Sequence, residues 1–170
     1  MARTIQTAGT GLPAGVETLL DQAAAVCLAR AVRLTEIRRL VLGLVLAADR
    51  PLGAYDLLEQ IRATRGRPVA PPTVYRALDF LMEQGLIHKI ERLSAFAGCR
   101  HMLESGHACH GHACHGHVHA AQFLICGKCG RVTELDDPHI LKALLEVTRA
   151  RGFSVRQTTI EAEGLCAACA

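Results

Sequence analysis

The chain has 170 residues, eight of them cysteine, few aromatic side chains and a formal net charge of +3. This length allows one moderate core or two small ones. No signal peptide is recognisable, and the longest apolar run, residues 40–48, is too short to cross a bilayer. We therefore expect a cytoplasmic protein with no membrane partner, whose reduced thiols favour metal binding over disulfides.

Helical patterns fill the first half of the chain. We expect residues 1–15 to be flexible and residues 16–30 to form an amphipathic helix. Apolar residues at helical spacing predict a second helix over residues 35–48, with Thr35 as its N-cap, and a third over residues 54–64.

A fourth helix is predicted to start at Pro71-Pro72, because proline is tolerated in a first turn, where the N–H has no helical partner. The helix ends at Gly85, and residues 86–90 and 93–102 predict the two strands of a hairpin. Three helices, a fourth with an exposed polar face, and a hairpin in this order predict a winged helix-turn-helix domain over residues 1–102. Such a domain binds double-stranded DNA through its fourth helix.

Basic residues precede the fourth helix, with no acidic residue between Glu59 and Asp79. A solvated loop is one interpretation of this charge; contact with DNA phosphates is the other. The side chains expected to contact DNA in this region are Arg62, Arg65, Arg67, Thr73, Tyr75 and Arg76.

Residues 103–119 contain a perfect internal repeat, His-Ala-Cys-His-Gly twice. The repeat, residues 107–116, has no large apolar side chain to order it, so one interpretation is that residues 103–119 form a disordered hinge between two domains. The other is a zinc-scavenging or zinc-sensing loop, which would bind weakly because ordering the loop costs conformational entropy. The ligands available to it are His107, Cys109, His110, His112, Cys114, His115 and His117.

Residues 120–170 predict a small α/β unit. Residues 121–126 and 131–135 have the pattern of strands, residues 138–151 that of a helix, and residues 153–162 that of a further strand. A unit this small has a thin core, so we expect zinc and a partner subunit to stabilise it. The helix residues expected to point inward are Ile140, Leu141, Leu144, Leu145 and Val147.

Two Cys-x-x-Cys pairs bracket this unit. Cys126 with Cys129 and Cys166 with Cys169 supply four thiolates, the closed tetrahedral set of a structural zinc site. A redox dithiol is the alternative for one pair alone. Two pairs, the first followed by Gly130, favour zinc.

Longer motifs carry a family resemblance. Residues 70–88 begin Ala-Pro-Pro-Thr-Val-Tyr-Arg, residues 123–130 read Phe-Leu-Ile-Cys-Gly-Lys-Cys-Gly, and residues 160–169 contain the second cysteine pair. With shorter matches at residues 32–35 and 54–58, they resemble the ferric uptake regulator (Fur) family and specifically its zinc uptake regulator (Zur) branch. The resemblance covers most of the chain except the histidine-rich loop.

The resemblance implies an α+β fold, in which a winged helix-turn-helix DNA-binding domain precedes a small α/β dimerisation domain stapled by zinc. It also implies a homodimeric, zinc-dependent repressor that binds AT-rich inverted repeats at zinc-acquisition genes. In such a protein, zinc would hold both DNA-binding domains in the orientation that reaches successive major grooves.

Particular ligands follow from the resemblance. The structural zinc site falls on the four paired cysteines, and a regulatory zinc site falls on His88, Cys99, His119 and Glu134. His117 or His101 could replace His119. Two Zn²⁺ ions per subunit are therefore expected, and more if the loop binds metal.

The resemblance also assigns roles at the DNA. Tyr55 and Arg76 match positions that touch bases. Glu59 and Arg62 match positions involved in contacts between neighbouring dimers on one operator.

Three other functions fit the sequence less well. An iron-, manganese- or peroxide-sensing regulator of the same family predicts a regulatory site without sulfur, and Cys99 argues against it. A zinc buffer or metallochaperone built on the repeat leaves the Pro-Pro-Thr-Val-Tyr-Arg helix unused. An enzyme is not expected, because the sequence shows no nucleophile–base pair, phosphate loop or open catalytic metal motif.

Overall fold

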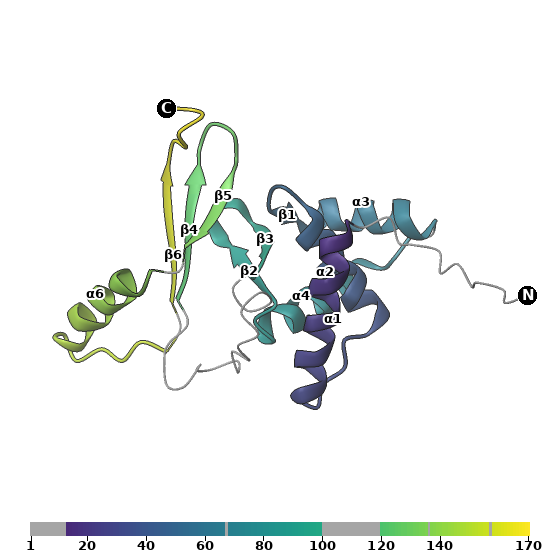
Figure 1. Ribbon diagram of the computed structural model, residues 1–170, viewed down its shortest axis with the longest axis horizontal. Coiled ribbons are helices and arrows are strands. Elements are labelled where there is room, and N and C mark those ends of the chain that lie inside the picture. Colours follow the sequence, from purple (N-terminus) through teal and green to yellow (C-terminus); the bar gives the residue numbers. More distant parts are fainter. Residues whose placement is uncertain (1–12, 67, 100–119, 136, 157) are drawn as a thin grey trace, which may run out of the picture.

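The computed structural model of the chain describes residues 13–66, 68–99, 120–135, 137–156 and 158–170. In Figure 1 a helical unit and a unit built on a second sheet lie side by side, with the hairpin β2–β3 between them. The elements are, in chain order, α1 (Ala14–Ala29), α2 (Glu36–Ala47), β1 (Leu52–Gly53), α3 (Ala54–Arg65), α4 (Pro71–Glu83), β2 (Ile87–Ile90), the 3-10 turn η1 (Glu91–Leu93), β3 (Ala95–Gly98), β4 (Ala120–Cys126), β5 (Val132–Leu135), α6 (Pro138–Arg149) and β6 (Thr158–Gly164).

Helices α1 to α4 share one hydrophobic core. The four helices predicted from apolar periodicity are confirmed, with boundaries within two residues of those expected. In α4 the apolar side chains Val74, Leu78 and Leu81 are buried, and α4 packs on α2. This packing leaves the opposite face of α4 exposed to solvent.

The connection from α3 to α4 positions this exposed face. Gly66 ends α3 with φ at +66°, a left-handed conformation that glycine adopts at low cost. Pro71 and Pro72 then open α4, where the missing N–H groups cost no helical hydrogen bond.

Over the residues that the structure describes, which end at Cys99 here, the hairpin is shorter than the sequence pattern predicts. The strand expected over residues 93–102 is only β3, because η1 takes up the first residues and Ser94 follows with a positive φ of 48°. Cys99 was expected on that strand, but it lies one residue beyond its end, where its N–H donates to the Leu86 carbonyl at 3.0 Å. The two-residue strand β1, which the sequence did not indicate, completes the sheet in the order β1-β3-β2.

The second unit is a three-stranded sheet in the order β5-β4-β6. Central β4 pairs antiparallel with β5 and parallel with β6. The last strand begins at Thr158 rather than at residue 153 and continues to Gly164, next to the second cysteine pair. The Asp137 carboxylate accepts a hydrogen bond of 2.8 Å from the His139 N–H and so caps α6, which Pro138 begins.

The apolar face of α6 is not buried within this chain. The expectation that it would point into a core was wrong for the single subunit: α6 has no buried residue, and Ile140 and Val147 are 38% and 51% exposed. The helix lies on the side of the sheet away from the helical unit (Figure 1). Its periodicity correctly indicated a helix with an apolar side, but not what covers that side.

The two units meet at the hairpin. Ile90 at the end of β2 is fully buried and packs with Ala121, Phe123 and Ile125 of β4. Because Ile87 of the same strand belongs to the helical core, β2 contributes to both hydrophobic clusters. Within the described residues, no helix is both long and apolar enough to span a membrane.

Candidate metal centres and DNA-binding surface

The four paired cysteines come together at one end of the second sheet. Their Sγ atoms all lie within 4.8 Å of one another, and Cys129 and Cys166 are 3.8 Å apart. A tetrahedron of sulfur atoms about 2.3 Å from a zinc ion has edges of about 3.8 Å. The spacing therefore fits a metal held between the thiolates, and it is far too long for a disulfide.

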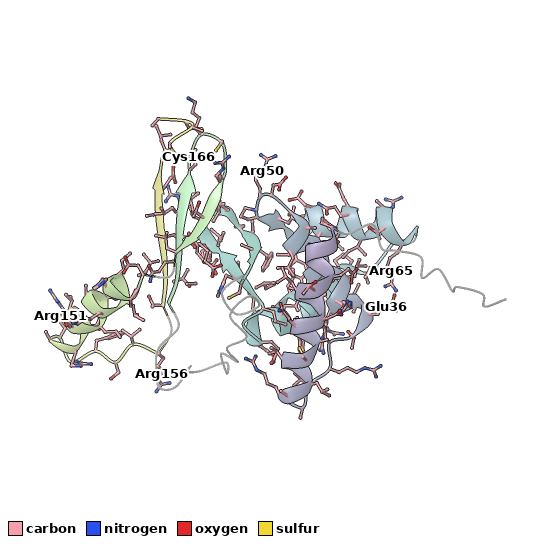
Figure 2. The ribbon with its side chains drawn as sticks, in the orientation of Figure 1. Glu36, Arg50, Arg65, Arg151, Arg156 and Cys166 are labelled. Carbon is pink, nitrogen blue, oxygen red and sulfur yellow. The ribbon has the colours of Figure 1, made fainter. Side chains whose placement is uncertain are left out.

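Local backbone geometry produces this arrangement. Cys126 ends β4 and Cys129 lies in the turn that follows, where the Gly130 N–H donates to the Cys126 carbonyl at 2.9 Å and Gly130 has a positive φ of 71°. The second pair follows β6, and parallel pairing of β6 with β4 brings it alongside the first. Figure 2 shows Cys166 at this end of the sheet.

The thiols of this cluster differ in acidity. Backbone N–H groups, that of Cys166 first among them, lower the pKa of Cys126 to about 6. Thiol hydrogen bonds with Cys166 and Cys129, followed by burial and the nearby Cys126 charge, raise the pKa of Cys169 to about 12. Four neighbouring thiolates repel one another, and a divalent cation is what allows all of them to ionise together.

A second group of ligand atoms lies where the two units meet. His88 from β2, Cys99 just after β3 and Glu134 from β5 have ligand atoms within 4.8 Å of one another. His88 Nε2 is 3.6 Å from Glu134 Oε1. One residue comes from each of three segments, so an ion held here would join the winged hairpin to the second sheet.

This mixed cluster is largely shielded from water. Cys99 is buried, and the side chains of His88 and Glu134 are 17% and 20% exposed. The Phe123 ring stands edge-on to the His88 imidazole, with centroids 5.7 Å apart. Sequence reasoning gave Phe123 no role, although the residue lies in the motif around the first cysteine pair.

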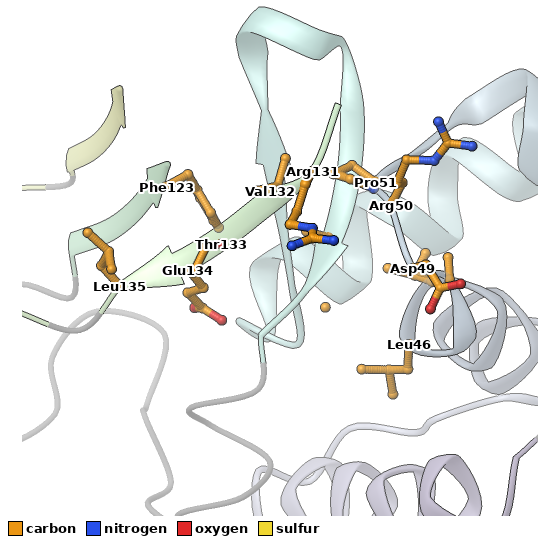
Figure 3. Close-up of a pocket in the computed structure, with 14 residues that line it drawn as sticks. Leu46, Asp49, Arg50, Pro51, Phe123, Arg131, Val132, Thr133, Glu134 and Leu135 are labelled. Atoms are coloured by element: carbon orange, nitrogen blue, oxygen red, sulfur yellow. The ribbon is translucent and has the colours of Figure 1, made fainter. Parts of the chain in front are cut away.

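A cavity of about 560 Å³ adjoins the mixed cluster, with Glu134 in its wall. Figure 3 shows that its lining comes from both units: Leu46, Asp49 and Arg50 on one side, and Arg131 and Glu134 on the other. The two units are therefore in contact through the hairpin on one side of the mixed cluster, and the cavity lies between them on the other side.

Several predicted ligands lie outside the described residues. They are His119, its alternatives His101 and His117, and the repeat residues His107, Cys109, His110, His112, Cys114 and His115. Arg67, expected near DNA phosphates, is also outside them.

The exposed face of α4 carries the residues expected to contact DNA. Thr73, Tyr75 and Arg76 are exposed there, while Tyr55 at the start of α3 is 79% exposed. At this exposure the Tyr55 side chain is accessible to DNA, as the expected contact requires. Arg62, on the outer face of α3, is also exposed.

Arg65 differs from these residues. Its guanidinium forms an ion pair with Glu36 in the first turn of α2, and its side chain is only 20% exposed. Figure 2 shows the two side chains together at the edge of the helical unit. Arg65 therefore links α3 to α2, a role that its place in a run of basic residues did not indicate.

Comparison with known proteins agrees with this architecture. Residues 29–163 match the model of the ferric uptake regulator family. The chain belongs to the ferric uptake regulator family. It is 39% identical over 153 residues to the zinc uptake regulation proteins of Escherichia coli K12 and Shigella flexneri, a match that covers 90% of this chain and 82% of each relative.

Solved structures of this family share the fold. A zinc uptake regulator in complex with zinc and DNA superposes with a TM-score of 0.76 at 37% identity, covering 92% of this chain and 95% of that one. The holo form of XcZur gives a TM-score of 0.72 at 38% identity, covering 89% and 96% of the two chains. The Fur-family fold with its winged-helix unit is thus shown for this chain.

Proposed function

We propose that the protein is a zinc-responsive transcriptional repressor that binds AT-rich palindromic operators of zinc-acquisition genes when its regulatory zinc site is filled. The observation that carries this proposal is the position of the His88, Cys99 and Glu134 cluster at the junction between the DNA-binding unit and the second sheet. Metal bound there would control the relative orientation of the two units. The similarity to zinc uptake regulation proteins supports the choice of metal and of target.

Each subunit binds two zinc ions in this proposal. The four cysteines hold the first, which stabilises the second sheet and stays bound. His88, Cys99 and Glu134, with His119 as the expected fourth ligand, hold the second. Its single thiolate suits zinc better than the harder iron or manganese ions. The six His and Cys residues of the repeat and the following His117 are additional ligands only if more than two ions bind.

The residues act through a population shift. In the closed form, the mixed cluster brings β2 and β3 of the wing against β5, and both α4 helices of a dimer can meet successive major grooves. Occupation of the site favours this form. A coupling of about 1–3 kcal/mol changes DNA affinity by about 5- to 150-fold, enough for regulation.

A homodimer supplies the two half-site contacts that a palindrome requires. The exposed apolar face of α6, with Ile140 and Val147, fits a buried position between two subunits. On longer operators, Glu59 of one dimer and Arg62 of its neighbour are suited to an ion pair between dimers. The protein acts on DNA in the cytoplasm as a regulator rather than as an enzyme.

A gel-shift titration tests the function. Promoter DNA of zinc-acquisition genes is incubated with the full chain and with zinc, iron(II), manganese(II) or a zinc chelator. We expect binding with zinc and its loss with the chelator. Equal binding under all these conditions would overturn the proposal, and stronger binding with iron or manganese would favour the other metal-sensing regulators.

A further inference from the structure

The wing of the DNA-binding unit also contacts the second sheet through residues that belong to neither cluster of metal ligands. Glu161 of β6 accepts two hydrogen bonds from the turn η1 at the wing tip. Its Oε1 accepts from the Glu91 N–H at 2.8 Å, and its Oε2 accepts from the Arg92 N–H at 3.2 Å. One carboxylate of the second unit therefore binds two successive backbone amides of the first.

Strand pairing places this contact opposite the mixed cluster. In the second sheet, Phe123 of β4 is paired with Glu134 of β5 on one side and with Glu161 of β6 on the other. Residues at paired positions point to the same face of a sheet. Glu134, Phe123 and Glu161 thus form a row across the three strands, on the face that meets the wing.

Strand β2 lies along this row. At its beginning His88 meets Glu134, and at its end Ile90 is buried against Phe123 and its neighbours. The next residues, Glu91 and Arg92, meet Glu161. The wing is therefore held at both ends, by metal-ligating groups at one and by a carboxylate at the other, with an apolar contact between.

The contacts at the two ends of the wing restrain the orientation of the DNA-binding unit in different ways. The metal-ligating end and the apolar contact of Ile90 restrain the first part of the wing but leave its tip, η1, free to move relative to β6. The two hydrogen bonds to Glu161 remove this freedom. They fix the position of the wing tip on the second sheet, which an ion at the other end of β2 does not do by itself. Hydrogen bonds from N–H groups to a charged acceptor are also stronger than those between neutral groups.

We propose that Glu161 is a positioning residue that latches the wing tip to the second sheet and thereby presets the orientation required for zinc-dependent DNA binding. The inference rests on the proposed function. Because the latch forms only in the closed form, it lowers the zinc concentration at which that form is populated. By linkage, loss of the latch must weaken zinc binding at the mixed cluster and leave the four-cysteine site unchanged.

A neighbouring ion pair provides a matched control. Arg92 also pairs with Glu163 of β6, but both side chains are well exposed, at 59% and 41%. Solvent and salt screen such pairs strongly. Neutralising Glu163 removes one negative charge from the same strand, facing the same wing residue, without touching the two amide contacts.

The test is a zinc titration of DNA binding by the full-length dimer, using an AT-rich inverted-repeat duplex selected by the zinc-loaded wild-type protein. For Glu161→Ala we expect the zinc concentration for half-maximal binding to rise by about three- to tenfold, with the same plateau, because the amide bonds are charge-assisted but partly solvated. Glu161→Gln keeps one acceptor and should fall between this variant and the wild type. Glu163→Gln should shift the midpoint by less than about twofold.

Hydrogen exchange of the zinc-loaded protein provides a readout that does not depend on DNA. We expect the amides of Glu91 and Arg92 to exchange faster in Glu161→Ala, with unchanged exchange in α2 and α4. An unchanged midpoint with unchanged exchange would overturn the latch, as would an equal shift in Glu163→Gln. Wild-type DNA binding that ignores zinc would instead overturn the proposed function, while the exchange result would still decide whether the latch exists.

Discussion

At the scale of residues, the two candidate metal-ligating clusters differ in charge and surroundings. Four thiolates around Zn²⁺ give a formal charge of −2, whereas one thiolate, one carboxylate and neutral histidines give zero. Fewer thiolates weaken zinc binding, so we infer that the mixed cluster is the exchangeable one. Because the mixed cluster lies between the two units, gain or loss of zinc there would affect how the units are held together. The four-cysteine cluster belongs to one unit only.

Replacement of Cys99 separates the two roles. In Cys99→Ala we expect zinc content to fall from two ions per subunit to one, and the zinc-dependent gain in DNA affinity, about 5- to 150-fold, to be lost. Elemental analysis with DNA-binding titrations measures both. Cys27→Ala is the control, since Cys27 is equally buried but lies on α1 in the helical core. Retention of the zinc response in Cys99→Ala would contradict the assignment.

The acidity of Cys126 leads to a pH prediction. Its pKa of about 6 lies below the ordinary value of 9, so it is already a thiolate at pH 7.5 in the metal-free protein. Its contribution to folding is complete above pH 9 and is lost as pH falls through 6. Zinc uptake by the four cysteines should thus release fewer than four protons at pH 7.5, and one more as pH falls through 6. Calorimetry in buffers of different ionisation enthalpy measures the number, and release of four at pH 7.5 would disagree.

At the scale of elements, the sequence predicted the helices correctly, because their positions depend on interactions between residues close together in the chain. The helices follow from apolar spacing, prolines at the start of α4 and glycine at its end, and the structure confirms them. The hairpin was less predictable, because the length of β3 depends on how η1 and Ser94 turn the chain. Strand β1 has only two residues, too few for any periodic signal.

The candidate sites also include features that the sequence predicted and features that it did not. The cysteine pairs could be found by spacing, and the mixed ligands by resemblance to a family. The pairing of Arg65 with Glu36 and the row of Glu134, Phe123 and Glu161 could not, because each joins segments far apart in the sequence. Such contacts depend on the packing of whole elements.

The contrast between two arginines tests the DNA-binding face. Removing Arg76 from the exposed face of α4 should cost about 1–3 kcal/mol of DNA binding and relax specificity, if it reads a base edge. Arg65→Ala should change DNA affinity by less than about threefold and lower the free energy of unfolding by up to about 1 kcal/mol, through loss of the pair with Glu36. Fluorescence anisotropy and thermal unfolding measure the two effects. Equal losses of DNA affinity would show that Arg65 also contacts DNA.

At the scale of the whole molecule, the chain leaves an apolar surface uncovered. The α6 side chains Ile140 and Val147 are exposed, and so is Phe153 in the following loop. The helix was correctly predicted as amphipathic, and none of its residues is buried within this chain. A second subunit is the covering surface that the proposed dimer supplies.

A charge on this surface should therefore separate the subunits. We expect Val147→Lys to shift the protein towards monomer and to weaken operator binding by more than about tenfold, since burying an unpaired charge is costly. Leu28→Lys on α1, where the side chain is 79% exposed, should leave the dimer intact. Sedimentation velocity measures the association state, and an unchanged dimer in Val147→Lys would place the interface elsewhere.

The central claim is that filling of the mixed cluster, rather than of the four-cysteine cluster, switches DNA binding on. The most direct measurement is a zinc titration of operator binding, with bound zinc per subunit determined at every point. We predict that the first ion per subunit binds without DNA affinity and that operator binding rises with the second. Full operator binding at one zinc ion per subunit would contradict the account.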